Sequence, residues 1–276
     1  MMTVDPYNYF NISHVINSSV KEQVSNKLNY RLWKMIQYRQ KPTENILLGD
    51  SRMILLQSDQ IKNQTDLDYY NFAYGGGSLE EIIETFWYAD SVAKLSSVYI
   101  GMNFHLFNAY HQVNEVAKIR NYLDNPFLYL VDRVVIKAGL LCVLDQLGVY
   151  KPEIEKPDMT EDQFWDFQLN TTAVGQFERY KYPDSNYLKL KEIVNYCQVN
   201  EIDVRFIIFP EHVDLMHKYF QLGLEDEFLK FKTDIMTLAP TYDYDVESIL
   251  TKTRSNFSDP YHFSDEISHY LIDDIW

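Results

Sequence analysis

The chain has 276 residues, of which 46% are apolar, so it can bury the core of one large domain or of two small ones. Its formal net charge of −15 argues against a nucleic-acid partner, because neutralising phosphates needs clustered lysine and arginine. No stretch approaches the roughly twenty apolar residues of a membrane span. The 22 tyrosines, 16 phenylalanines and 4 tryptophans suit an aromatic core or stacking against sugars.

The first part of the chain predicts strands that alternate with helices. Apolar residues recur at helical spacing before Pro42, so residues 1–44 are expected to form an amphipathic helical segment that packs on the domain. An apolar strand is expected at 45–49, with helical spacing behind Ser51. A second strand at 68–74, a helix from Ser78 to about Leu95 and a third strand at 97–101 follow.

The second part begins with a mostly helical region at about 104–182. It is predicted to be an insertion, because strands resume after it. A helix at about 184–200, a strongly apolar strand at 203–209, helices within 211–238, a weak strand near 241–246 and a closing helix complete the chain. Residues 45–276 therefore read as one α/β domain whose parallel sheet is covered on both faces.

Glycine and polar residues end the first three predicted strands. They are Gly49, Asp50 and Ser51 after the first, Gly75–Gly77 after the second, and Gly101 with Asn103 after the third. The carboxyl ends of parallel strands share one edge of the sheet, so these groups are expected to meet at one crevice. Backbone N–H groups there could hold a developing oxyanion.

A serine nucleophile needs a base, and Asp259 and His262 offer one near the end of the chain. Pro260 makes a regular helix across the pair unfavourable, so a short turn can bring the carboxylate to one ring nitrogen while the other faces a serine. Asp214 with His217 and Glu266 with His269 have the same spacing. Both of those pairs lie in helical patterns and fit solvated faces better.

Together these segments resemble the four blocks of the SGNH (GDSL-type) hydrolases, in the right order. The resemblance covers about residues 45–276 and implies a flavodoxin-like three-layer sandwich with a five-stranded parallel sheet and a serine esterase activity. By position, Ser51 would be the nucleophile, His262 the base and Asp259 its orienting partner. The Ser51 N–H, Gly76 and Asn103 would form the oxyanion hole.

Two departures from the family pattern stand out. The third block usually ends in Gly-x-Asn-Asp, and Phe104 occupies the last position here. The run Gly75–Gly77 leaves the choice of glycine open, with Gly76 as the simplest assignment. Neither departure removes a catalytic group.

The segment at 5–10, ahead of a helix and a strand that ends in Gly-Asp-Ser-Arg, resembles the membrane-anchored, extracytoplasmic branch of these proteins that works beside acyltransferases on polysaccharides. This narrower resemblance implies a cell-envelope location, an N-terminal anchor absent from this chain and a membrane acyltransferase partner. A cytoplasmic location stays open. No cofactor is expected.

Each assignment has a plainer alternative. Ser51 could be a helix cap, His262 a structural histidine and Asn103 a turn residue. Arg52 and His212 are candidate substrate contacts. The alternative for Arg52 is an exposed or salt-bridged arginine, and His212 is expected near the same crevice at the end of the fourth strand. His105 and His111 lack the companions of a metal site, so no metal is expected. Cys142 and Cys197 read as buried thiols, with a disulfide left open.

The sequence therefore predicts a serine esterase or acyl-transfer enzyme. Its expected substrate is an O-acyl, in particular O-acetyl, ester, with an acylated carbohydrate as the favoured class and a small ester as the simplest form. The alternative is a non-catalytic protein that uses the same fold to bind a polysaccharide or a partner. Acyl length, hydrolysis versus transfer, and the oligomeric state cannot be read from these residues.

Overall fold

The computed structural model describes residues 2–12, 14–151 and 159–276. The chain divides into two compact units, Met1–Pro42 with Asn114–Pro157, and Thr43–Val113 with Asp158–Trp276. This division differs from the expected boundaries, because the middle of the predicted insertion associates with the N-terminal helix. The expectation that residues 1–44 pack on the domain stays a prediction.

The larger unit is built on the predicted five-stranded parallel sheet. Its strands follow the order β2-β1-β3-β4-β5, and every neighbouring pair is parallel. The strands are β1 (Asn45–Leu48), β2 (Tyr69–Asn71), β3 (Ser97–Met102), β4 (Asp203–Ile208) and β5 (Thr241–Asp243). This strand order is that of flavodoxin-like folds. The α/β sandwich expected from the sequence is therefore confirmed.

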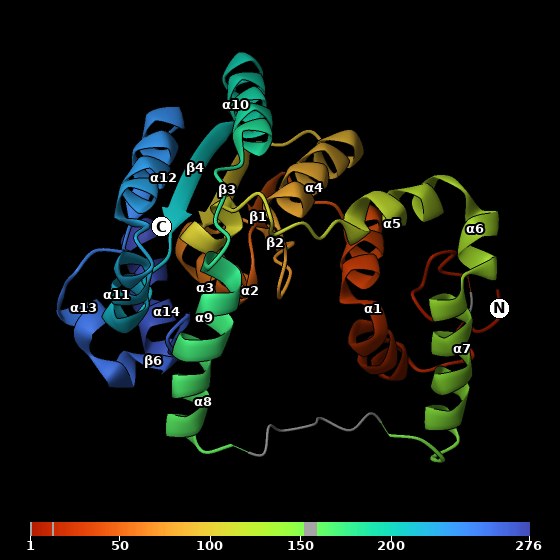
Figure 1. The fold of residues 1–276 in the computed structure, drawn as a ribbon. Helices are drawn as coiled ribbons and strands as arrows, with labels where there is room; N and C mark the ends of the chain where they lie inside the picture. Colours follow the sequence, from red (N-terminus) through yellow and green to blue (C-terminus); the bar gives the residue numbers. More distant parts are fainter. Residues whose placement is uncertain (1, 13, 152–158) are drawn as a thin grey trace. The chain divides into compact units, whose positions relative to one another are not determined.

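Helices cover both faces of this sheet, as the continuous apolar runs of its strands require. On one face, α3 (Ser58–Thr65) and α14 (Asp265–Ile275) share a core cluster with Leu47, Tyr99 and Ile207 of the strands. On the other face, α4 (Leu79–Val92) and α10 (Asp184–Val199) pack against β1, β4 and each other (Figure 1). All six residues of β3 are buried between these layers.

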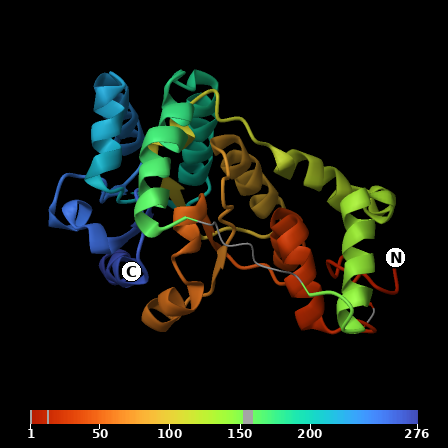
Figure 2. The ribbon, with the colours of Figure 1, turned by 60° about the horizontal axis from the view of Figure 1, so that its bottom comes forward.

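One long helical rod runs through α8 (Glu161–Phe167), a π-helical segment (Gln168–Thr172) and α9 (Ala173–Phe177). It appears as one continuous element in both views (Figures 1 and 2). The remaining elements of the larger unit are α2 (Ser51–Ile54), a 3₁₀ turn (Phe104–Phe107), α11 (Val213–Gln221), α12 (Glu225–Leu238), α13 (Ile249–Lys252), a second 3₁₀ turn (Arg254–Asn256) and the hairpin β6–β7 (Phe257–Asp259, His262–Phe263).

The smaller unit is helical. It contains α1 (Ser18–Gln40), α5 (Glu115–Asp124), α6 (Pro126–Val131) and α7 (Arg133–Gln146), and α1 packs against α5 and α7. The helix α1 is interrupted at Asn29, whose φ of −156° and ψ of 84° are not helical. The buried Asp5 carboxylate ties the preceding turn together by accepting the backbone N–H groups of Tyr9, Phe10 and Asn11.

Among the described residues, no helix combines the length and apolar character that crossing a membrane requires. These residues hold no cluster of three or more His, Cys, Asp or Glu side chains that could bind a metal ion. Both cysteines, Cys142 and Cys197, are free and buried.

Candidate active site

The strand order places the candidate nucleophile at the end of β1, beside the central strand β3. Because β1 and β3 are neighbours although β2 intervenes in sequence, their carboxyl ends flank the point where the direction of strand addition reverses. Ligands bind at this point in open parallel sheets. Ser51 follows β1 and Asn103 follows β3, so the fold brings residues 52 positions apart in sequence to the same edge of the sheet.

Close packing explains why the strand ends carry glycine. At Gly101 an added Cβ would lie 2.5 Å from a ring carbon of Phe209, so a larger residue would force this ring to move. Past the end of β1, the Asp50 carboxylate accepts the Arg52 backbone N–H at 2.9 Å and so begins α2. The cap of this short helix is therefore Asp50, which leaves the Ser51 hydroxyl free for another partner.

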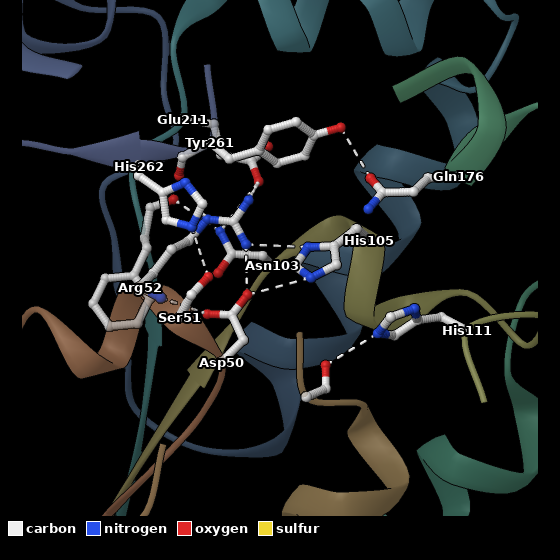
Figure 3. A network of polar contacts seen from close by, with 12 residues as sticks. Asp50, Ser51, Arg52, Asn103, His105, His111, Gln176, Glu211, Tyr261 and His262 are labelled. Atoms are coloured by element: carbon white, nitrogen blue, oxygen red, sulfur yellow. Dashed lines mark hydrogen bonds and ion pairs between the residues drawn. The ribbon is translucent and has the colours of Figure 1, made fainter. Parts of the chain in front are cut away.

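That partner is His262. The Ser51 Oγ lies 2.7 Å from His262 Nε2, and His262 Nδ1 lies 2.8 Å from Asp259 Oδ2 (Figure 3). The Asp259 carboxylate only accepts hydrogen bonds, so His262 Nδ1 carries the proton and Nε2 accepts the serine hydroxyl. Hydroxyl, imidazole and carboxylate are thus connected in the order that general-base activation of a serine requires.

A tight hairpin sets the spacing of the Asp–His pair. Asp259 ends β6 and His262 begins β7, and the two residues face each other across the antiparallel ladder. Asp259 Oδ1 also accepts the backbone N–H groups of Tyr261 (2.8 Å) and His262 (3.2 Å), which fixes the carboxylate in the turn. The predicted short turn is confirmed, whereas His217 and His269 lie in α11 and α14.

The environment keeps the Asp259 carboxylate ionised. Burial by itself would raise the pKa of Asp259. The hydrogen bond and the charge of His262 lower it by more than burial raises it, so the pKa lies below its ordinary value. A carboxylate that stays charged can stabilise an imidazolium at its Nδ1–H.

A buried ion network lies beside Ser51. The Arg52 guanidinium, 1% exposed, donates to Asp50 Oδ2 at 2.6 Å and to Glu211 Oε1 at 2.5 Å. Its Nε donates to the backbone carbonyl of Tyr261 at 2.9 Å. Of the two interpretations of Arg52, the structure supports the salt-bridged one. The arginine borders the cavity, but its donors are taken up by protein acceptors and do not favour a substrate contact.

His105 joins this network and was not assigned a role by the sequence. Its Nδ1 lies 3.1 Å from Arg52 Nη1, which can only donate, so the proton of the neutral ring is on Nε2, 3.3 Å from Asp50 Oδ2. Burial and the positive charge of Arg52 hold the pKa of His105 well below its ordinary value. The uncharged ring of His105 therefore forms part of the cavity wall at physiological pH.

The Asn103 side chain is bound to protein acceptors, and its expected place in the oxyanion hole stays a prediction. This side chain is fully buried, and Nδ2 donates to the Phe209 carbonyl at 3.3 Å and to Glu211 Oε1 at 3.4 Å. It does not line the cavity beside Ser51. The physical reason is that the Glu211 carboxylate, buried at the end of β4, draws both Asn103 and Arg52 toward it.

His212 also lies outside the cavity. Its Nδ1 accepts the Asp214 backbone N–H at the start of α11, and its ring packs against Trp165 and Phe257. Its backbone N–H donates to the Pro260 carbonyl at 3.0 Å. The expected substrate contact is therefore replaced by a link between α11 and the turn that carries His262.

The cavity beside Ser51 has a volume of about 180 Å³. Gly76 lines it with φ of +64°, a conformation that favours glycine, and its role in the oxyanion hole stays a prediction. Among the hydrogen bonds of the described residues, the backbone N–H groups of Ser51 and Gly76 have no acceptor. These two groups are available to a ligand.

The opposite wall comes from the α8–α9 rod. Gln168, Thr172 and Gln176 recur at every fourth residue and face the cavity. Gln168 and Thr172 belong to the π-helical segment, a feature that often marks functional sites. Gln176 Oε1 accepts the Tyr261 hydroxyl at 2.9 Å. These residues were not predicted from the sequence, because polar residues at helical spacing also fit a solvent-exposed helix face.

Comparisons with known proteins identify remote structural similarity alone. No protein-family model matches the chain, and no curated protein matches it in sequence. One similar solved structure is a Streptococcus pneumoniae protein described as a platelet activating factor, with 8% identity, a TM-score of 0.46 and coverage of 94% of this chain and 97% of that one.

Two further structures are similar. A Desulfitobacterium hafniense protein assigned to the lipolytic G-D-S-L family has 11% identity and a TM-score of 0.38, covering 84% of this chain and 96% of that one. A Bacteroides fragilis protein assigned as an acylhydrolase has 12% identity and a TM-score of 0.42, covering 91% and 92%. Because all three TM-scores are below 0.5, these similarities do not support a function, and the function is inferred from the geometry of the site.

Proposed function

We propose that this protein is a serine esterase or acyl-transfer enzyme that acts on O-acyl esters. The observation that carries the proposal is the connected series from Ser51 Oγ through His262 to Asp259, with separations of 2.7 and 2.8 Å. Ser51 alone could be explained as a turn residue. A hydroxyl donated to an imidazole that is itself held by a buried carboxylate is the arrangement that activates a nucleophile.

The reaction follows from these positions. Ser51 Oγ attacks the ester carbonyl while His262 Nε2 takes the hydroxyl proton, and the carbonyl oxygen becomes an oxyanion beside the N–H groups of Ser51 and Gly76. Collapse breaks the ester bond, and His262 returns the proton to the departing alcohol. Water or a sugar hydroxyl then attacks the acyl-serine with His262 again as base, which releases the acid or a new ester and restores Ser51.

The shape and polarity of the cavity favour a short acyl group on a hydroxylated alcohol. About 180 Å³ leaves little room for a long chain beside Ser51. Gln168 and Thr172 present an amide and a hydroxyl that make no hydrogen bonds within the described part of the chain, so they can pair with hydroxyl groups of a ligand. These features support an O-acetylated carbohydrate. The extracytoplasmic location and the membrane acyltransferase partner implied by the resemblance stay predictions.

Hydrolysis of 4-nitrophenyl acetate tests the proposal. The wild-type chain should release 4-nitrophenol faster than buffer, and Ser51→Ala should lose this rate by about 10³-fold or more. Ser185→Ala, an exposed serine on α10, is the matched control and should keep the wild-type rate. Equal rates for wild type and Ser51→Ala would contradict the proposal and leave the non-catalytic binding protein as the better explanation.

A further inference from the structure

A second cavity of about 380 Å³ adjoins the one beside Ser51. The two share His105, His111 and Gln176 in their walls, and Asn108, Tyr110 and Arg179 complete the polar lining of the second. Figure 3 shows His105, His111 and Gln176 on one side of the Ser51–His262 pair. A substrate whose ester lies at Ser51 would therefore extend across these residues into the larger space.

The charge of this second cavity is unusual for the chain. The protein carries 40 acidic residues against 25 lysines and arginines, yet the lining of the cavity contains arginine and no aspartate or glutamate among the described residues. Arg179 is exposed at this wall and, within the described ranges, makes no ion pair or hydrogen bond. Its neighbour Glu178 does not line the cavity.

Existing hydrogen bonds determine which lining groups remain available. Both ring nitrogens of His105 are engaged, and the Asn108 side chain bonds to the Gln176 carbonyl and to the backbone of Tyr110. Gln176 uses its Oε1 for the Tyr261 hydroxyl, so its Nε2 is left to donate. His111 Nε2 donates to the Gly77 carbonyl at 3.0 Å. The N–H donors left for a ligand are the Gln176 amide and the Arg179 guanidinium, and the Tyr110 hydroxyl can also donate.

We propose that this second cavity binds an anionic group, a phosphate or a carboxylate, carried by the alcohol portion of the substrate. Two N–H donors, one of them a guanidinium, match the oxygens of such a group, and the absence of a lining acid removes charge repulsion. The inference rests on the proposed esterase function and narrows its substrate class to acylated alcohols that bear a negative charge.

Matched acetate esters test this assignment through catalysis. The three substrates are methyl 4-acetoxybenzoate (neutral), 4-acetoxybenzoate (carboxylate) and 4-acetoxyphenyl phosphate. Arg179→Gln should lower the ratio of kcat/KM for an anionic ester to kcat/KM for the neutral ester by roughly three- to tenfold. Lys191→Gln, which removes the same charge from exposed α10, should leave this ratio unchanged. An Arg179→Gln ratio equal to that of the wild type for both anions would overturn the assignment.

Binding measured by calorimetry separates this inference from the proposed function. Phenyl phosphate and benzoate should bind the full chain more tightly than benzyl alcohol, and Arg179→Gln should weaken the Kd of at least one anion three- to tenfold. The anion with the larger loss identifies the ligand chemistry. Equal affinity for anions and benzyl alcohol would overturn the inference. Arg179-dependent binding without hydrolysis of any ester would contradict the esterase function alone.

Discussion

Arg52 Nε donates a hydrogen bond of 2.9 Å to the backbone carbonyl of Tyr261, the residue immediately before His262. The same guanidinium holds Asp50, the residue immediately before Ser51, at 2.6 Å. One buried cation thus connects the turn that carries Ser51 with the hairpin that carries His262. It can act as a positioning residue for two side chains 211 positions apart.

Arg52→Lys tests this link between the two turns. Lysine keeps the positive charge but cannot reproduce the guanidinium fork, so the contacts to Tyr261, Asp50 and Glu211 cannot all be kept. We expect kcat for 4-nitrophenyl acetate to fall more than tenfold with a smaller change in KM, and unfolding to occur at a lower temperature because buried charges lose partners. Arg205→Lys, half-buried on β4, is the control. Unchanged kcat in a folded Arg52→Lys variant would exclude a positioning role.

Asp259→Asn tests the orientation of His262. An amide at this position can turn its NH₂ toward Nδ1, which moves the imidazole proton to Nε2 and removes the acceptor for Ser51. We expect kcat to fall by about 10³- to 10⁴-fold while the protein stays folded. The exposed Asp226→Asn should keep the wild-type rate. A loss below tenfold would show that Asp259 does not set the tautomer.

Asn103→Ala separates a structural role from the oxyanion role implied by the resemblance. Removing the amide leaves the Phe209 carbonyl without this partner and deprives Glu211 of a donor. We therefore expect the free energy of unfolding to fall by about 1–3 kcal/mol, with less than a tenfold loss of kcat. A loss of 10²- to 10³-fold in kcat with unchanged stability is the signature of an oxyanion donor and would contradict the observed orientation.

Asp245 makes stability depend on pH. Burial and then the negative charge of Glu211 raise the pKa of Asp245 well above its ordinary value. Because the folded pKa exceeds the unfolded one, this group's contribution is fully present below the unfolded pKa and is lost as pH rises through the folded pKa. Asp245→Asn should therefore raise Tm relative to wild type at pH 8 and give little gain at pH 3. A stabilisation of about 1 kcal/mol corresponds to roughly 2–4 °C.

The matched control for Asp245→Asn is Asp243→Asn. Asp243 holds Lys232 in an ion pair of 3.0 Å, so its removal should lower Tm at pH 8. Thermal unfolding of the three proteins followed by circular dichroism at both pH values gives the comparison. A fall in Tm for Asp245→Asn at pH 8 would contradict the assigned direction.

Local pattern was enough to predict the sheet and the triad candidates. The apolar runs at 45–49 and 97–101 end in glycine, the run at 203–209 is followed by Pro210, and each contains a strand of the parallel sheet. The Asp259–His262 spacing was informative because Pro260 disfavours a helix there. The contacts of Arg52 and Asn103 could not be predicted, since both depend on Glu211, which lies more than 100 residues away in sequence.

The sequence pattern also did not predict that the helical region would be divided between the two units. Residues 104–182 read as one helical insertion, but α5 and α7 pack against α1, while the rod that includes Gln168 and Thr172 forms a wall of the cavity. Helical periodicity reports that a face is apolar, not which distant element it will cover. The polar residues of this rod can be recognised as part of the site only because the fold places them in the wall of the cavity beside Ser51.

Covalent labelling with a fluorophosphonate probe shows directly whether the Ser51 hydroxyl is an activated nucleophile. Mass spectrometry of the wild-type chain should find one adduct, located on Ser51, with none in Ser51→Ala and strongly reduced labelling in His262→Ala. No adduct under conditions where a known serine esterase reacts would contradict the account. Labelling of His262→Ala at the wild-type rate would also contradict it, because the serine would then be reacting without its base.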